Sequence, residues 1–417
     1  MQSFNRKQII GAALGIAVGL IIGLAVPDAG ISRQGLACLG VLAGAIIWWI
    51  ADVLPEFVTA LLMAILFVGV CGISFESVFS QFTKETIWLI MAAYGLGHCM
   101  RKTGLMERLA NGILHLFPRS FGSQMAGVMV TGTLIGPLIP SLAAKATMFT
   151  PIVMSVSDGM GYKRGSRQAL GFFQAAMAGI QTVSPVVISA SAIGFALLGL
   201  LPEETQRHYD LLHWFIAASP ILIISLILNT VALTIMFRPK ANRADKAASS
   251  TAGENANLRE STASAPPTDA NSHTSPAMDG PEKKMACIIG ITLLLWLTEP
   301  LHGISSCMIA LGALAACFIF GLMDRQDFKS GIDWTSLIFI GIVLGLAAVL
   351  SEAGVIDWLM QNTGPAFASL AQNPWLFLMA IALTMFLMRF VIVSQIASLN
   401  VLLALVIPLA VAYGINP

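Results

Sequence analysis

Residues 136–145 read GPLIPSLAAK and interrupt a long apolar region of the chain. Apolar runs over about 120–138 and 141–157 flank this stretch, and its prolines prevent one continuous helix. Ser141 is a good N-cap residue, so the second run is expected to begin a helix beside it. The pattern predicts a re-entrant helical hairpin over 120–157, whose non-helical tip at membrane depth must line a cavity or be buried in protein.

The composition of the whole chain is that of a polytopic membrane protein. Of its 417 residues, 56% are hydrophobic and 11% are charged, whereas soluble domains carry about 25% charged residues. The net charge of +1 argues against a nucleic-acid binder. No HExxH, GxSxG or Walker A pattern occurs, so no enzyme is predicted. The six cysteines lie in or beside apolar runs and are expected to be small core residues.

Basic residues set the expected orientation. With the N-terminus in the cytoplasm, 18 of the 23 Lys and Arg lie on the cytoplasmic side and three lie outside. An excess of Lys and Arg marks the cytoplasmic face. The prediction is therefore a multi-pass protein of the plasma membrane, the inner membrane in a bacterium, with a cytoplasmic N-terminus.

A polar segment over 238–284, rich in Ala, Ser, Thr, Asn and Pro, divides the chain into halves 1–237 and 285–417. It has no hydrophobic period, and we expect a disordered cytoplasmic linker. The halves resemble each other. Gly95-Leu96 precedes Gly104 as Gly345-Leu346 precedes Gly354, and Ser141 precedes Pro151 by ten residues, as Ser398 precedes Pro408.

The basic residues give these halves opposite topologies, which is the usual build of a secondary transporter. The expected fold is all-α, with two inverted-topology repeats, re-entrant hairpins at 120–157 and 373–414, and a broken span at 168–200. The second repeat is expected to be C-terminally incomplete, because the chain ends soon after Ser398.

Two further stretches are predicted to be non-helical at membrane depth, 179–185 and 394–400. At each break a new helix begins, with free N–H groups and a positive dipole end that suit an anion. Hydroxyl and amide groups there can donate to a carboxylate or a sulfate. The candidate substrate-binding residues at the three breaks are Ser141, Lys145, Thr182, Ser184, Pro185, Ser394, Ser398 and Asn400.

On these residues the chain resembles the divalent-anion/sodium symporter family, whose members carry dicarboxylates, citrate or sulfate. The family's two hairpins each carry Ser-Asn-Thr ten residues before a proline, and Ser141 and Ser398 match the serines. Leu142-Ala143 and Leu399-Asn400 depart from the Asn-Thr that follows, and in the family those asparagines contact substrate and sodium. Thr182 and Ser184-Pro185 match the family's Thr/Ser–Pro element. The resemblance implies an elevator-type transporter and a homodimer.

Two basic residues lie within membrane segments, where charges are costly and by default functional. Lys145 is one turn after Ser141, and the exchanger branch of the family resembles this, with an arginine four residues after the motif serine. Lys145 is expected to compensate substrate charge; the alternative is a lysine snorkelling to the surface. Arg389 is a second candidate for charge compensation, and it is expected to pair structurally or to lie in an outward vestibule rather than to contact substrate directly.

The predicted function is secondary active transport of small divalent anions, di- and tricarboxylates such as malate, succinate, 2-oxoglutarate or citrate, by anion exchange. The alternatives are a sodium-coupled symporter of dicarboxylate or sulfate, and a non-transporting truncated remnant. No cofactor, metal or nucleic acid is expected as a partner, and sodium is possible but not expected. The expected partners are the anionic substrate, the lipid bilayer and a second copy of the chain.

Overall fold

The structure is a computed structural model, and it describes residues 5–24, 30–201, 205, 211–239, 278–362, 373–391 and 395–412. Every regular element in these ranges is helical. The elements before the polar linker are α1 (Arg6–Gly23), α2 (Arg33–Ala51), α3 (Glu56–Gly69), α4 (Phe75–Val78), η1 (Ser80–Thr83), α5 (Glu85–Lys102), α6 (Leu105–Leu114), α7 (Phe121–Ile135), η2 (Gly136–Leu138), α8 (Leu142–Gly159), α9 (Arg167–Thr182), η3 (Ile188–Ala190), α10 (Ala192–Leu200) and α12 (Leu211–Phe237).

The elements after the linker form a shorter series. They are α14 (Gly280–Leu297), α15 (Glu299–His302), α16 (Ser306–Ile319), α17 (Arg325–Gly331), α18 (Trp334–Leu344), α19 (Leu346–Glu352), α21 (Pro374–Val391) and α22 (Gln395–Ala412). Within the described residues, four helical stretches are long and apolar enough to cross a membrane: Arg6–Gly23, Arg33–Ala51, Leu212–Phe237 and Trp334–Glu352. Three shorter apolar helices accompany them.

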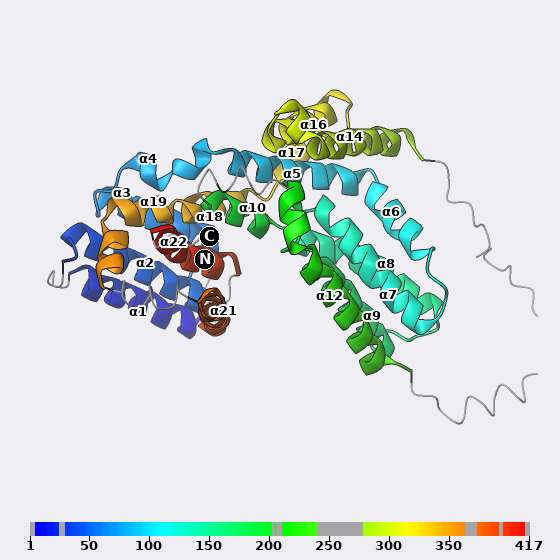
Figure 1. The fold of residues 1–417 in the computed structure, drawn as a ribbon, viewed down its shortest axis with the longest axis horizontal. Coiled ribbons are helices and arrows are strands. Elements are labelled where there is room, and N and C mark those ends of the chain that lie inside the picture. Colours follow the sequence, from blue (N-terminus) through cyan, green and yellow to red (C-terminus); the bar gives the residue numbers. More distant parts are fainter. Residues whose placement is uncertain are drawn as a thin grey trace, which may run out of the picture.

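The helices form two groups joined by a central layer (Figure 1). On one side lie α1 to α4 with α19, α21 and α22, and on the other lie α6 to α9 with α12. The central layer contains α5, α10, α16 and α18, and in it α16 of the second half packs on α5 of the first half. At the edge of this layer, α3 of the first group packs on α18. The first contact is tight, because a Cβ at Gly95 of α5 would lie 2.5 Å from Leu314 of α16.

Helices α1 and α2 pack through glycines. Gly11, Gly15, Gly19 and Gly23 recur every four residues along α1 and therefore share one face of that helix. A Cβ at Gly40 of α2 would lie 2.4 Å from the carbonyl oxygen of Gly19. Small residues allow such close backbone approach, which is how helices associate in lipid without a hydrophobic driving force.

Replacing Gly40 with alanine is therefore expected to destabilise the protein by about 1–3 kcal/mol, the usual cost of overpacking. The thermal transition in detergent measures the effect. Gly290→Ala is the matched control, since a Cβ at Gly290 of α14 has nothing within 4 Å. Equal transition temperatures for the two variants would contradict this account of α1–α2 packing.

Three predictions of local structure differ from the structure. The predicted non-helical stretch 394–400 is helical from Gln395 onward, where α22 begins, because 395–400 contain no proline or glycine that would interrupt a helix. Helix α14 begins at Gly280 rather than 285, because Asp279 and Glu282 form a capping box there. The predicted break at 179–185 begins later, since α9 continues to Thr182. Gly179 serves close packing instead of ending the helix: a Cβ there would lie 2.4 Å from the carbonyl oxygen of Met129 in α7. The predicted linker residues 240–277 lie outside the described residues.

Candidate functional site

The first candidate residue, Ser141, caps a helix at the tip between α7 and α8. Helix α7 ends in the short 3-10 turn η2, which contains Pro137, and the chain is extended at Ile139. The Ser141 hydroxyl oxygen accepts a hydrogen bond from the backbone N–H of Ala144 at 3.3 Å. The hydroxyl hydrogen remains available for a ligand, because no donation by this group occurs among the described residues.

Lys145 is buried behind this tip, with 1% of the residue exposed. Its ammonium donates to the carbonyl oxygen of Ala190 at 2.6 Å and to that of Gly136 at 3.4 Å. Both carbonyls lie at the C-terminal ends of helical segments, where the backbone dipole is negative. These contacts exclude a lysine that snorkels to the membrane surface.

The Lys145 contacts join the hairpin tip to the break in the span of α9 and α10. The backbone N–H of Ala192 donates to the carbonyl oxygen of Pro140 at 3.3 Å. A Cβ at Gly136 would lie 2.3 Å from the side chain of Val183. The tip and the break are therefore one packed unit, although about 45 residues separate them in the chain.

Thr182 is the last residue of α9, and Ser184 and Pro185 follow the end of that helix. The Thr182 hydroxyl donates to the carbonyl oxygen of Ala178 at 2.7 Å, and the Ser184 hydroxyl donates to that of Ile180 at 3.0 Å. The carbonyl of Pro185 accepts from the indole N–H of Trp214. In this conformation both hydroxyl hydrogens are used inside the helix, so these groups can offer a ligand only their oxygen lone pairs.

The second hairpin tip is described only in part. Ser394 lies outside the described residues, and Asn400 lies in α22. Ser398 is fully buried, and its hydroxyl donates to the carbonyl oxygen of Gln395 at 3.1 Å. Arg389 is an exposed residue of the last turn of α21. Helices α21 and α22 pack on each other, and α22 also packs on α10 and α18.

A cavity of about 440 Å³ lies beside the first tip, a volume typical of small-molecule sites. Of the predicted substrate residues that the structure describes, Ser141 alone lines it. The other walls come from α5 and from the end of α17 through the start of α18. The lining residues are Tyr94, Gly97, His98, Arg101, Ile139, Ser141, Ala144, Lys329, Ser330, Gly331, Ile332, Asp333, Trp334 and Thr335.

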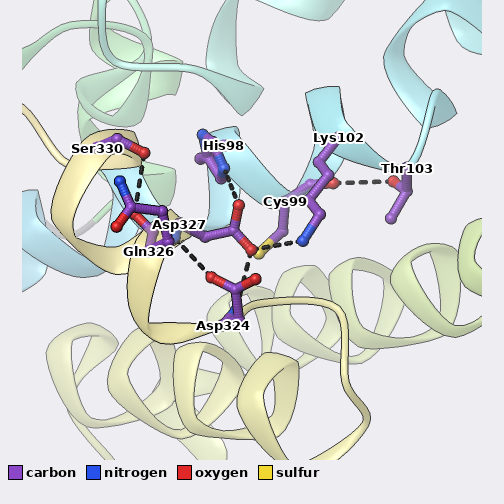
Figure 2. Close-up of polar contacts among 8 residues, drawn as sticks. All are labelled: His98, Cys99, Lys102, Thr103, Asp324, Gln326, Asp327 and Ser330. Atoms are coloured by element: carbon purple, nitrogen blue, oxygen red, sulfur yellow. Dashed lines mark hydrogen bonds and ion pairs between the residues drawn. The ribbon is translucent and has the colours of Figure 1, made fainter.

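A polar cluster fixes one wall of this cavity (Figure 2). Asp327 of α17 accepts from Lys102 at 2.5 Å and contacts the imidazole of His98 at 3.1 Å. Its carboxylate also accepts from the backbone N–H of Asp324, which begins the helix. The hydrogen bond from Lys102 holds the pKa of Asp327 well below its usual range. The cluster attaches α17 to the end of α5 and was not predicted, because its partners are more than 220 residues apart.

The described residues contain no group of three or more His, Cys, Asp and Glu that could hold a metal ion. Backbone carbonyls are the other common cation ligands at broken helices. Two such carbonyls meet between the tip and the break, and the Lys145 ammonium already occupies them.

The chain matches the family model described as the sodium:sulfate symporter transmembrane region over residues 6–417. It is 25% identical to spinach (Spinacia oleracea) dicarboxylate transporter 2, chloroplastic, over 85% of this chain and 61% of that relative. It is 24% identical to YflS of Bacillus subtilis, named as a malate transporter, over 85% of this chain and 72% of the relative. It is 23% identical to the inner membrane protein YbhI of Escherichia coli over 86% and 73%. This chain therefore belongs to the sodium:sulfate symporter family, and it is a multi-pass membrane protein of a transporter family, not an enzyme.

Proposed function

We propose that this protein is a secondary active transporter of small di- and tricarboxylates that exchanges one anion for another. The observation that carries the proposal is the buried Lys145 ammonium, held by two backbone carbonyls where the hairpin tip meets the broken span. The names of the relatives, a chloroplast dicarboxylate transporter and a malate transporter, support carboxylates as the substrate class.

The position of Lys145 argues for exchange. A dianion at membrane depth needs compensating positive charge, and symporters supply it with co-bound cations. Here the carbonyls of Gly136 and Ala190 already hold a covalently attached ammonium, so a sodium ion at the same carbonyls would meet a like charge. An empty carrier would have to move this fixed charge without its anion, which is unfavourable. If the carrier returns with a second anion bound, the charge of Lys145 does not cross without a counter-charge.

We also propose that the two halves are inverted repeats, and several paired contacts support this. Gly104 and Gly354 both adopt positive φ, +76° and +72°, directly after helices α5 and α19. Lys102 at the end of α5 binds Asp327 of the second half. Glu352 at the end of α19 accepts from the N–H and hydroxyl of Ser74 in the first half, at 2.9 and 2.8 Å.

The N-terminal ends of α2 and α14 make a further matched pair of contacts, each with the other half of the chain. Ser32, the N-cap of α2, donates to the carbonyl oxygen of Ala353 at 3.2 Å, beside the turn at Gly354. Glu282 in the first turn of α14 binds Arg108 at 2.8 Å, beside the turn at Gly104. Each of these contacts thus has a counterpart in reverse, which is the packing expected of inverted repeats. An elevator-like movement of the hairpins, a homodimer and a cytoplasmic N-terminus remain part of the proposal.

Two alternatives make different predictions. A sodium-coupled symporter of dicarboxylate or sulfate requires a cation site away from the carbonyls that Lys145 occupies. A non-transporting remnant requires no substrate site. The cavity lined by Ser141 favours a protein that still binds a small molecule.

Counterflow into proteoliposomes tests the function directly. We expect labelled malate, succinate or citrate to accumulate only in vesicles loaded with unlabelled dicarboxylate, at equal rates in sodium and choline buffers. Empty liposomes give the background. Uptake that requires sodium and ignores the internal anion would establish the symporter instead, and uptake of none of the three anions would end the proposal.

A further inference from the structure

The cavity beside Ser141 has a second feature, a pair of cationic side chains from different parts of the chain. Arg101 comes from the last turn of α5, and Lys329 comes from the last turn of α17. Both line the cavity and both are solvent-exposed. Neither side chain makes a hydrogen bond or an ion pair with any of the residues that the structure describes.

Neighbouring charges of the same region are, by contrast, paired. Lys102 binds Asp327 of α17. Asp333, the carboxylate in the cavity wall, caps helix α18: it accepts from the Ser336 N–H at 3.0 Å, the Ser336 hydroxyl at 2.6 Å and the Thr335 hydroxyl at 2.7 Å. The hydrogen bonds to Asp333 come from neutral groups and leave its negative charge in place. Among these three lining residues the cavity therefore has two cations without an ion-pair partner and one carboxylate, so positive charge is in excess.

We propose that Arg101 and Lys329 form an anion-capture pair that binds one carboxylate of a dicarboxylate while the other lies at Ser141. The proposal rests on the proposed function and deepens it, because it names residues that select dianions over monoanions. A guanidinium matches a carboxylate in a two-pronged geometry, and a lysine adds a mobile point charge. Since both groups are exposed, their attraction should also be weakened by salt.

The wall that holds the pair is built to be rigid. The imidazole of His98 packs so close to Gly331 that a Cβ there would lie 2.4 Å from the ring. The indole N–H of Trp334 donates to the carbonyl oxygen of Phe328 at 3.3 Å, and the two aromatic rings stack edge to face. Together with the Asp327 cluster in Figure 2, these contacts fix α17, and hence Lys329, against the end of α5.

Equilibrium binding of labelled malate and of its monomethyl ester to the purified protein tests the pair. Arg101→Gln and Lys329→Gln are each expected to raise the Kd for malate about tenfold, and to leave binding of the monoanionic ester nearly unchanged. Arg101→Lys and Lys329→Arg should retain most of the preference for the dianion. Raising the salt concentration should weaken malate binding to the wild type more than to either glutamine variant.

Arg325→Gln is the matched control, since Arg325 is exposed one turn earlier on α17 and does not line the cavity. If the glutamine variants bind malate with the Kd and salt dependence of Arg325→Gln, the two cations only mark the cytoplasmic membrane surface and the inference is wrong.

Failure of the proposed function is a separate result. If the wild type binds malate but does not transport it, the anion-capture pair stands and the proposed transport function is wrong. If malate does not bind, the same variants are compared with inorganic sulfate: unchanged sulfate affinity overturns the pair, and weakened affinity supports it.

Discussion

Replacing Lys145 with alanine is expected to slow dicarboxylate exchange about 100-fold, and to make the remaining uptake depend on sodium. The substitution removes a buried ammonium that donates to the carbonyl oxygens of Ala190 and Gly136. The carbonyl of Gly136 keeps only its 3.4 Å hydrogen bond from the N–H of Ile139. An interaction of about 3 kcal/mol with a charged group corresponds to roughly 100-fold in rate or affinity. Sodium can then approach the same two carbonyls, because the like charge is gone.

Uptake is measured in vesicles with and without internal anion, each in sodium and in choline buffer. Lys163→Ala is the control, since Lys163 is an exposed residue between α8 and α9. Lys145→Met retains the side-chain volume, and it separates loss of charge from loss of packing through its thermal transition. A Lys145→Ala protein that is folded and matches the wild type in all four conditions would contradict the assigned role.

The two motif serines are expected to differ, with Ser141→Ala weakening substrate binding about 10- to 150-fold and Ser398→Ala having little effect on binding. The hydroxyl of Ser141 lines the cavity and accepts one hydrogen bond from Ala144, so it retains a donor for a carboxylate. The hydroxyl of Ser398 is buried and already donates to Gln395. A lost hydrogen bond to a charged group costs about 1.5–3 kcal/mol.

Apparent affinity for malate in exchange assays measures both variants. Ser141→Thr serves as a control, because threonine keeps the hydroxyl and still caps the helix. Equal losses of affinity in Ser141→Ala and Ser398→Ala would indicate that both tips contact substrate, in a conformation different from the one described here.

Local features of the chain predicted much of this architecture. The prolines at 137 and 140 fix the end of α7, and Ser141 caps α8 as its position in the sequence predicts. The all-helical, multi-pass character follows from the apolar composition. These predictions succeed because capping and proline chemistry act within one helical turn, where the sequence itself supplies both partners.

The partners of the candidate residues could not be predicted in the same way. The location of Lys145 in a membrane segment was evident, but its contact with Ala190 depends on how two distant breaks pack. The break predicted over 179–185 begins after Thr182, because Gly179 lies inside α9 and permits close packing on the Met129 carbonyl of α7. Arg101 and Lys329 are two of the 18 basic residues that predict the orientation of the chain in the membrane. Their shared cavity could not be predicted, because nothing local brings together residues that lie more than 220 positions apart.

The reciprocal packing of the central layer has a consequence for biosynthesis. Helix α5 packs on α16, which begins about 200 residues later in the chain. At roughly 5–20 residues per second, the ribosome needs about 10–40 s to make that partner. During this interval the face of α5 that includes Gly95 lacks its partner α16, and lipid or the insertion machinery must cover it. Closure of the central layer is therefore a late step of membrane assembly, and until then the nascent first half is open to quality-control proteases.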